Sequence, residues 1–419
     1  MRQGISQGRF LFVVPPLTGH VNPALGIARA LAARGHDVAW AGSERLLRPM
    51  LGLDATVYQT GMRPFRGQGD LGAAAVKSLW EAFAVPLARF TRPAVEKAVR
   101  QYRPDVILAD QHAFAGPIVA HRNGLPWASL APSSLELARP YRALPKVDAW
   151  MRAQLEALWA EAGLPPGEFC DLRFSPYLVI AFTTPALTGT ADFPEHFALV
   201  GPAITSRPAP SFPWERLDPG RRHVLVTVGT VAIDISDDFY ARAVEALQPV
   251  ADRVQGIMVT LPAALPDPPE NIIVTERVPL LNLLPQLDAV VCHAGLSTVC
   301  ETLAYGVPLV VAPVGRDQPI TAAQVEAAGA GVRVKYGRVR PDQLRAAIMT
   351  VLGDPAYRAA AARLRDSFTA AGGAPAAAQR LEQLARQPVA RPTADEETSS
   401  ALSRASTIQG RSGDAWRGS

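Results

Sequence analysis

Short apolar runs that favour β-strands recur along this chain, and helix-forming segments separate most of them. The first run, residues 10–14, precedes a predicted helix that Asn22 caps, that has Pro23 in its first turn and that Gly35 ends. Residues 37–40 form the next run. Continuous apolar runs are typical of strands buried on both faces of a parallel sheet, so this β-α-β order predicts an α/β fold.

The runs form two series on either side of a proline-rich stretch. The first series continues at residues 105–109, 126–130, 177–182 and 197–201. The second covers residues 223–228, 256–260, 271–274, 289–292, 308–312 and 332–334. Five of the 38 prolines lie within residues 202–222. Because 419 residues suffice for two domains, we predict two doubly wound, Rossmann-like α/β domains of similar size.

The expected boundaries follow from this pattern. Residues 1–205 form the amino-terminal domain, 206–222 the linker and 223–387 the carboxyl-terminal domain, whose last helix is a candidate to pack back on the first domain. Residues 388–419 are rich in Ser, Thr, Arg and acidic residues without apolar periodicity. They predict a disordered tail.

Composition argues against several classes of function. The 42 basic and 38 acidic residues give a formal charge of +4, and no basic stripe indicates a nucleic-acid partner. Three cysteines form no disulfide framework, which fits the cytoplasm. No segment approaches the roughly 20 apolar residues of a membrane span, and the start does not resemble a signal peptide.

Common cofactor and metal motifs are also missing. The sequence has no H-E-x-x-H, no paired Cys-x-x-Cys and no Walker loop, so no metal is expected. Residues 67–72 match G-x-G-x-x-G but follow no apolar strand, and we interpret them as a loop. The first strand ends without this fingerprint, which argues against a nicotinamide or flavin enzyme.

Residues 292–301 are the leading candidate for a binding segment. A predicted buried strand ends there in a turn of small residues that opens a helix, and the exposed amides and helix dipole favour an anion such as a diphosphate. His293 and Thr298 can add donors, and Glu301, one turn further on, can accept hydrogen bonds from sugar hydroxyls. The alternative is an ordinary helix start with a glutamate that faces solvent.

A second candidate segment follows the next predicted strand. Asp317 and Gln318 place a carboxylate beside a carboxamide, and such a pair can bind sugar hydroxyls in a bidentate way. The alternative is that Asp317 only caps the following helix.

In the first half, His20 follows the first strand and Asp110 ends another. A histidine at the carboxyl edge of a sheet can act as a general base near neutral pH, and a carboxylate can orient its ring. The alternative is a structural histidine with a helix-capping aspartate. His112 is a rival partner or base.

Together these segments resemble the family 1 nucleotide-sugar-dependent glycosyltransferases, in particular the bacterial natural-product enzymes of the macrolide and antibiotic type. The resemblance covers about residues 9–387. It rests on Gly19-His20-Val-Asn-Pro, on Val228-Gly229-Thr230, and above all on His293-Ala-Gly-x-x-Thr298-x-x-Glu301-x-Leu-x-x-Gly306-Val-Pro308 followed by Asp317-Gln318.

The resemblance implies a GT-B fold, two Rossmann-like domains that face each other across a cleft, and a role for each matching residue. His20 would deprotonate the acceptor and Asp110 would be its partner. In the donor site, Glu301 would hold the ribose, Asp317 and Gln318 the sugar, and the backbone of Val278 the nucleobase. The donor-binding residues as a set would be Thr230, Val278, His293, Ala294, Gly295, Ser297, Thr298, Glu301, Asp317 and Gln318.

The function implied is an inverting, metal-independent transfer of a sugar from a UDP- or dTDP-sugar to a hydroxyl of a hydrophobic, polyketide-like acceptor. The nucleotide sugar is a co-substrate and no cofactor is implied; the chain would be a monomer or homodimer. Aromatic and apolar residues could wall the acceptor pocket, although each could equally be core: Met62, Phe65, Trp80, Phe83 and Trp150. Alternatives are a nucleotide-sugar epimerase on the same fold and a non-catalytic helper of a partner transferase.

Overall fold

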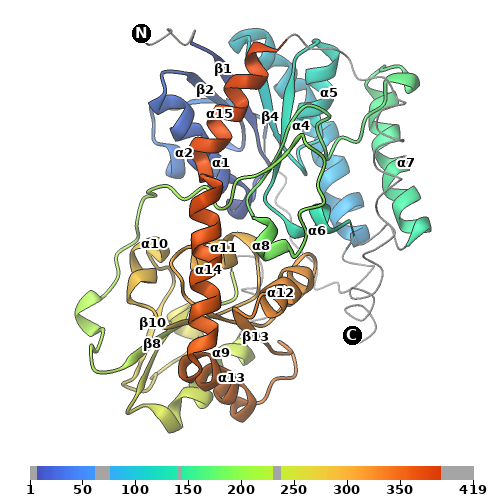
Figure 1. Cartoon of the computed structure of the whole chain (residues 1–419). Helices are drawn as coiled ribbons and strands as arrows, with labels where there is room; N and C mark the ends of the chain where they lie inside the picture. The colour runs from blue at the N-terminus through green and yellow to red at the C-terminus, as the bar shows by residue number, and fades with distance from the viewer. Residues whose placement is uncertain (1–6, 62–75, 140–143, 230–236, 388–419) are drawn as a thin grey trace. The chain divides into compact units, whose positions relative to one another are not determined.

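The computed structural model describes residues 7–61, 76–139, 144–229 and 237–387 (Figure 1). They divide into two compact units. Unit 1 comprises the described residues of 1–182, 192–205 and 371–419, and unit 2 comprises those of 183–191 and 206–370. No helix among the described residues has both the length and the apolar character needed to cross a membrane.

Unit 1 contains a seven-stranded parallel sheet in the order β3-β2-β1-β4-β5-β6-β7. Its strands are β1 (Arg9–Val13), β2 (Asp37–Gly42), β3 (Thr56–Gln59), β4 (Val106–Asp110), β5 (Trp127–Ala131), β6 (Val179–Ala181) and β7 (Phe197–Leu199). The chain order reverses between β1 and β4, and in open parallel sheets ligands bind at such switch points, beyond the carboxyl ends of the strands.

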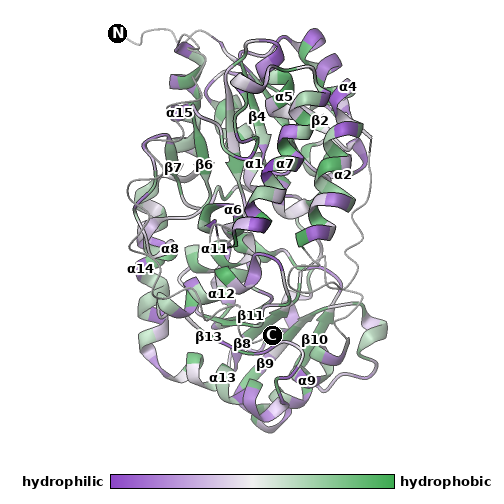
Figure 2. Ribbon diagram, turned by 90° about the vertical axis from the view of Figure 1, so that its right-hand side faces the viewer, coloured by the Kyte–Doolittle hydropathy of each residue, from purple (hydrophilic) through white to green (hydrophobic). Residues whose placement is uncertain are grey.

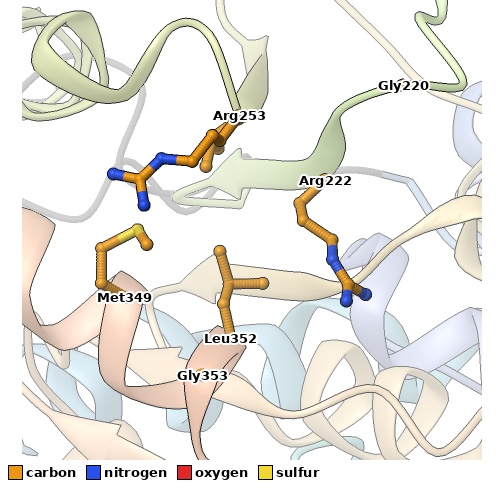
Figure 3. A pocket seen from close by; sticks show the side chains of 7 residues that line it. Gly220, Arg222, Arg253, Met349, Leu352 and Gly353 are labelled. Carbon is orange, nitrogen blue, oxygen red and sulfur yellow. The ribbon is translucent and has the colours of Figure 1, made fainter.

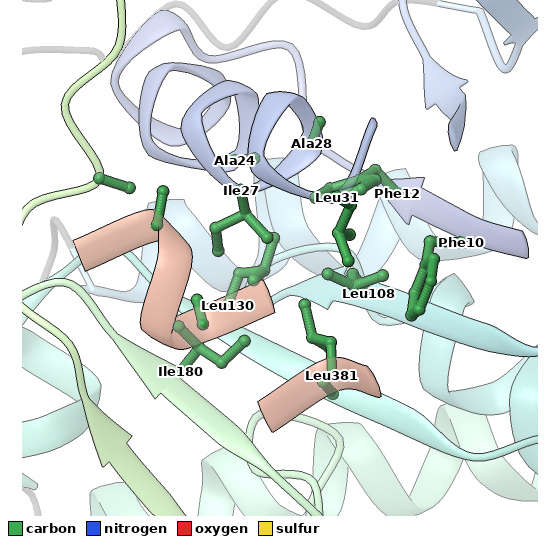
Figure 4. Close-up of a cluster of buried hydrophobic side chains, with 14 of the residues drawn as sticks. Phe10, Phe12, Ala24, Ile27, Ala28, Leu31, Leu108, Leu130, Ile180 and Leu381 are labelled. Atoms are coloured by element: carbon green, nitrogen blue, oxygen red, sulfur yellow. The ribbon is translucent and has the colours of Figure 1, made fainter. Parts of the chain in front are cut away.

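Helices complete unit 1. They are α1 (Thr18–Ala33), α2 (Glu44–Leu51), η1 (Leu79–Ala84), α4 (Val85–Tyr102), α5 (Ala115–Arg122), α6 (Ser134–Ala138), α7 (Pro145–Glu161), η3 (Pro166–Glu168) and α15 (Gly373–Arg386). On one face of the sheet, α1 and α15 share a core with the strands, in which Phe12, Ile27, Leu31, Leu130 and Leu381 are almost completely buried (Figure 4).

Unit 2 contains a six-stranded parallel sheet in the order β10-β9-β8-β11-β12-β13. Its strands are β8 (Arg222–Thr227), β9 (Val254–Val259), β10 (Ile272–Thr275), β11 (Ala289–Cys292), β12 (Leu309–Val311) and β13 (Gly331–Arg333). The strands are largely apolar (Figure 2). The expectation of two doubly wound, Rossmann-like α/β domains is therefore confirmed.

Separate apolar clusters cover the two faces of this second sheet, one including residues of α11, α12 and α14 and the other residues of α9 and α13. The longer helices of unit 2 are α9 (Asp237–Leu247), α11 (Leu296–Ala304), α12 (Gln318–Ala327), α13 (Pro341–Gly353) and α14 (Pro355–Ala371). Short helical segments are α8 (Pro185–Thr188), η4 (Trp214–Arg216), η6 (Gln248–Val250), η7 (Pro262–Ala264), α10 (Leu280–Leu283) and η8 (Leu284–Gln286).

The start of α1 differs from the sequence-based expectation. The helix begins at Thr18, so Asn22 is not its cap and Pro23 lies inside it. Leu17 is the N-cap residue, in an extended conformation and without a side-chain capping bond. Pro23 has no N–H to donate to the Gly19 carbonyl, so α1 lacks that one backbone hydrogen bond. His20 consequently lies on the first turn of a helix.

The two compact units divide the chain at positions that differ from the expected domain boundaries, except that the last expected helix packs on the first domain, as one alternative had it. Residues 183–191 belong to unit 2, where Leu187 joins the core that includes α11 and α14. Residues 371–387 belong to unit 1, because the apolar face of α15 packs against α1 and the sheet. The predicted tail, residues 388–419, lies outside the described residues.

Candidate functional site

His20 and Asp110 form a hydrogen-bonded pair at the carboxyl edge of the first sheet. Asp110 ends β4, His20 lies on α1 directly after β1, and β1 pairs with β4. His20 Nδ1 lies 2.8 Å from Asp110 Oδ2. The Asp110 side chain is fully buried and that of His20 is 17% exposed. An ionised carboxylate accepts the Nδ1–H, which leaves the lone pair on Nε2 and enables that nitrogen to accept a proton.

His112 lies next to this pair. Its backbone N–H donates to Asp110 Oδ1 at 2.9 Å, and its ring centre lies 5.1 Å from that of His20. The ligand atoms of His20, Asp110 and His112 lie within 4.8 Å of one another, so these side chains could in principle hold a metal ion. However, two ligand atoms of a tetrahedral zinc lie about 3.3 Å apart. The distance of 2.8 Å between His20 Nδ1 and Asp110 Oδ2 is shorter and is typical of a hydrogen bond.

The residues expected to wall an acceptor pocket lie in different surroundings. Trp80 and Phe83, on η1, are almost completely buried. The Trp80 ring contacts the rings of Phe114 and Trp150, and Trp150 is partly exposed. Met62 and Phe65 lie outside the described residues. The acceptor pocket stays a prediction, although burial shows that Trp80 and Phe83 contribute to the core of unit 1.

In unit 2, the candidate diphosphate segment has the expected strand-turn-helix form. β11 ends at Cys292 and α11 begins at Leu296, and between them Ala294 has a left-handed φ of 66°. Ser297 and Thr298 lie in the first turn of α11 and are partly exposed. The first amides of a helix have no partner within the helix and carry its positive dipole, so this turn is suited to an anion.

The imidazole of His293 lies between two glycines. A Cβ added to Gly229 would lie 2.6 Å from the ring, and one added to Gly295 would lie 2.5 Å from it. Burial lowers the pKa of His293 to about 4, although a hydrogen bond to the Thr227 backbone opposes the shift. Among the described residues, its Nδ1 atom has no hydrogen-bond partner. The neutral ring carries a single N–H, so it can offer an anion at most one donor.

Glu301, on the next turn of α11, is paired with an arginine that sequence reasoning did not identify. Arg207 Nη2 donates to Glu301 Oε2 at 2.9 Å. The side chains are 19% and 13% exposed respectively. Burial raises the pKa of Glu301, and Arg207 opposes the shift. The alternative of a solvent-facing glutamate is wrong. Because Arg207 lies 94 positions earlier, in the proline-rich stretch, no local signal could have identified it.

Asp317 and Gln318 lie at the start of α12, beyond the carboxyl end of β12, which pairs with β11. Asp317 occupies the N-cap position without a side-chain capping bond, so capping does not explain it. Gln318 Oε1 accepts hydrogen bonds from the backbone N–H groups of Val314 and Gly315, at 2.8 and 3.1 Å. The carboxamide therefore holds its own loop and offers a ligand mainly its NH₂ group.

Two further residues, Val278 and Thr230, were expected in the donor site. Val278 is half-buried, and its carbonyl accepts a hydrogen bond from Leu280 N–H. Thr230 lies outside the described residues. The structure thus gathers the residues from His293 to Glu301 with Asp317 and Gln318 at the carboxyl ends of two paired strands.

A hollow of about 310 Å³ lies elsewhere in unit 2 (Figure 3). Its lining residues are Gly220, Arg222, Arg253, Val254, Met349, Leu352 and Gly353. They include the first residues of β8 and β9, whereas the candidate site lies at the carboxyl ends of strands. Arg222 already pairs with Asp288 at 2.7 Å. This hollow is therefore separate from the candidate site.

Known proteins resemble this chain along most of its length. Residues 245–384 match the family model described as the C-terminal domain of erythromycin biosynthesis protein CIII-like proteins. The 4'-demethylrebeccamycin synthase of Lentzea aerocolonigenes is 30% identical, over 86% of this chain and 96% of the relative. The demethyllactenocin mycarosyltransferase of Streptomyces fradiae is also 30% identical, over 89% of this chain and 86% of the relative.

Solved structures share the whole fold. The crystal structure of the glycosyltransferase of kitacinnamycin superposes with a TM-score of 0.76 at 27% identity, over 90% of this chain and 99% of that one. The glycosyltransferase VinC, solved in complex with dTDP, superposes with a TM-score of 0.71 at 21% identity, over 90% of this chain and 99% of that one.

Proposed function

Because this chain belongs to the family 1 natural-product glycosyltransferases of GT-B fold, we propose that it is an inverting enzyme that uses His20 as its general base. It transfers a sugar from a dTDP- or UDP-sugar to a hydroxyl group of a hydrophobic, polyketide-like acceptor. The observation that carries this proposal is the 2.8 Å contact between His20 Nδ1 and the buried carboxylate of Asp110.

The dyad activates the nucleophile, which is the hydroxyl of the acceptor. As the acceptor oxygen attacks the anomeric carbon, its proton passes to His20 Nε2, and the Asp110 carboxylate stabilises the imidazolium that forms. The bond between the anomeric carbon and the phosphate oxygen breaks, and the nucleoside diphosphate leaves with the electron pair. A single displacement of this kind inverts the anomeric centre.

Unit 2 supplies the stabilisation of the leaving group. The first amides of α11 can take up the negative charge that develops on the diphosphate, as preorganised backbone donors do in other active sites. We expect Glu301 to accept a hydrogen bond from the ribose, and Asp317 with the Gln318 NH₂ group to bind the hydroxyls of the sugar. In this proposal the protein's own donors do the work that a metal ion often does, and no cofactor is needed.

The known relatives support the substrate classes. Two of them are named for rebeccamycin and lactenocin, VinC was solved with dTDP, and the matching family model is described by erythromycin biosynthesis. These names motivate an antibiotic-type acceptor and a dTDP- or UDP-linked donor for this chain.

A mass-spectrometric screen tests the proposal. The protein is incubated with dTDP- and UDP-sugars, each with a panel of hydroxylated hydrophobic aglycones. We expect one aglycone to gain the mass of a sugar, with release of an equal amount of nucleoside diphosphate and inversion at the anomeric carbon. Conversion of the donor into an epimer without any acceptor would instead identify a nucleotide-sugar epimerase, and binding without turnover on the whole panel would favour a non-catalytic helper.

A further inference from the structure

The hydroxyl of Tyr240 joins the ends of two strands next to the candidate site. We propose that Tyr240 is a positioning residue for the diphosphate of the nucleotide, and that it acts through the backbone of Val228 and Gly229 and the ring of His293. The inference rests on the proposed function, in which the diphosphate binds at the turn between β11 and α11. It adds a residue that neither the sequence motifs nor the proposed function includes.

Tyr240 lies on α9 and is almost completely buried, so the side chain itself is not exposed to a ligand. The last paired residues of β8 and β9 are Val226 and Met258. Just beyond them, the Tyr240 hydroxyl accepts a hydrogen bond from the Val228 N–H at 3.3 Å and donates one to the Val259 carbonyl. The hydroxyl therefore connects the carboxyl ends of the two strands at the point where their own pairing stops.

The hydroxyl can make both bonds only while it keeps its proton. Burial raises the pKa of Tyr240 to about 12, so the group is neutral near pH 7 and can donate and accept at once. Val228 is almost completely buried, so its N–H has little access to water as a replacement partner. Loss of the hydroxyl would leave this donor and the Val259 carbonyl without their common partner, an arrangement that folded proteins disfavour.

The backbone that Tyr240 holds lies against the His293 ring. Gly229, directly after Val228, has a left-handed φ of 74°, and a Cβ added to it would lie 2.6 Å from Cε1 of His293. The backbone of Thr227 makes a hydrogen bond with the same imidazole. Both contacts come from the end of β8, which pairs with β11. The end of β8 therefore forms one wall of the slot that holds the ring.

The other wall of this slot is the turn that would bind the diphosphate. A Cβ added to Gly295 would lie 2.5 Å from Nε2 of His293. Because protein interiors are close-packed, a shift of one wall displaces the ring and with it the other wall. Loss of the Tyr240 hydroxyl should therefore shift the turn at Gly295, which leads into the first amides of α11. A small displacement of preorganised donors weakens their interaction with an anion.

Titration of dTDP into the full-length Tyr240→Phe protein tests the inference. The substitution removes one oxygen and keeps the aromatic ring in the core. By isothermal titration calorimetry, we expect the Kd for dTDP to rise roughly five- to tenfold.

Val351→Ala is the control for lost stability. Val351 is a buried core residue of α13, next to Leu352, which lines the hollow at the amino ends of β8 and β9. This variant should lower the Tm at least as much as Tyr240→Phe does, because it opens a space in the core. Its Kd for dTDP should equal that of the wild type, because the change lies at the opposite ends of the strands.

The nuclear magnetic resonance signal of the His293 ring gives a second readout. The chain has seven histidines, few enough to resolve their ring signals in protein that carries isotope-labelled histidine, and His293→Gln identifies the signal of His293. In Tyr240→Phe this signal should shift, whereas in Val351→Ala it should stay in place. A purely structural role of Tyr240 would lower the Tm and leave both the signal and the Kd as in the wild type.

The outcomes separate this inference from the proposed function. Wild-type affinity for dTDP in folded Tyr240→Phe, an unmoved His293 signal, or an equal loss of affinity in Val351→Ala overturns the inference and leaves the proposed function standing. If Tyr240→Phe does not fold, 4-fluorophenylalanine in place of Tyr240 fills the space of the hydroxyl and should give the same loss of affinity. If the wild-type protein binds neither dTDP nor UDP, the proposed function itself fails.

Discussion

Asp110 uses both of its carboxylate oxygens. Oδ2 lies against His20 Nδ1 and Oδ1 accepts the backbone N–H of His112, so the carboxylate cannot rotate without losing a bond. Its side chain is fully buried, which strengthens both contacts. The orientation of the His20 ring is therefore fixed from the protein interior, as a general base requires.

Replacement of His20 tests the role of this residue. For His20→Ala we expect kcat to fall by about 10²–10⁴-fold, because the acceptor proton loses its base. The dissociation constant for dTDP should change little, since the proposed nucleotide site belongs to unit 2. Asp110→Asn, which keeps the shape but not the charge, should also lower kcat. Turnover of His20→Ala near that of the wild type would exclude His20 as the base.

Gln318 allows its two possible roles to be separated. Gln318→Glu keeps an oxygen that can accept from Val314 and Gly315 but removes the NH₂ group, so the loop should persist while the donor sugar loses a partner. We expect kcat/KM for the nucleotide sugar to fall roughly tenfold with an unchanged Tm. Gln318→Ala should lower both. Equal losses of Tm in the two variants would mean that the NH₂ group serves the fold rather than the substrate.

At the scale of elements, the turn between β11 and α11 depends on close packing of backbone and ring. Gly295 has a φ of −65°, which any residue can adopt, so its replacement by alanine adds only the methyl group. That methyl would lie 2.5 Å from His293 Nε2 and must displace the ring or the turn. The site therefore constrains this position by space rather than by backbone conformation.

For Gly295→Ala we expect the affinity for dTDP to fall about tenfold or more, with a loss of about 1–3 kcal/mol in the free energy of unfolding. Calorimetric titration and denaturant unfolding measure the two effects. Gly337→Ala is the matched control, because nothing lies within 4 Å of its added methyl, and it should leave both quantities unchanged. Wild-type affinity in Gly295→Ala would show that the diphosphate does not depend on this turn.

The carboxylate of Glu382, on helix α15, pairs with two residues from the first part of unit 1. Glu382 accepts hydrogen bonds from Arg34 at 2.6 and 2.8 Å and lies 2.8 Å from His36 Nε2. The hydrogen bond from Arg34, with a smaller effect of His36, lowers the pKa of Glu382 to about 2. The Glu382 carboxylate thus binds a proton more weakly in the folded state than in the unfolded state. The resulting stabilisation is present above about pH 4.5 and is lost as the pH falls toward 2.

Glu382→Gln should therefore be less stable than the wild type at pH 7, by about 3 kcal/mol, because Arg34 and His36 lose their charged partner. The difference between the two proteins should shrink as the pH is lowered from 4.5 to 2.5. Thermal unfolding at several pH values measures it. Glu161→Gln, which removes an exposed carboxylate from Arg89, should cost less than 1 kcal/mol. A stability difference between Glu382→Gln and the wild type that stays constant with pH would contradict the proposed contribution of the Glu382 charge.

The elements differ in how far the sequence could predict them. β11 matches the expected run at both ends, because a strand buried on both faces leaves an uninterrupted apolar signal. The sequence does not predict β3, because it is a short edge strand whose residues are partly or fully exposed and give no continuous apolar run. The predicted start of α1 was wrong because the Asn-Pro pair favours a helix that starts at Asn22. Nothing in the sequence reveals the helical turn that precedes it.

At the scale of the whole molecule, the proposed chemistry is divided between two separately packed units. The dyad belongs to unit 1, and the proposed anion-binding turn with Glu301 belongs to unit 2. Local motifs identify both parts because each lies next to a strand end. Pairings across the chain, such as Arg207 with Glu301 or Glu382 with Arg34, leave no local signal, since their partners lie 94 and 348 positions away.

Unit 1 is completed by α15, the last helix among the described residues, which predicts the effect of truncation. Ending the chain after Ala371 removes Leu381 and Leu384, two almost completely buried core residues whose burial contributes about 1.5–3 kcal/mol each, and also removes Glu382. Because domains are stable by only about 5–15 kcal/mol, unit 1 should unfold at a much lower temperature. Unit 2 keeps its own core and should still bind dTDP. Ending the chain after Gln387 is the control and should leave calorimetric unfolding unchanged. An unchanged transition in the shorter protein would mean that residues 1–205 fold without α15.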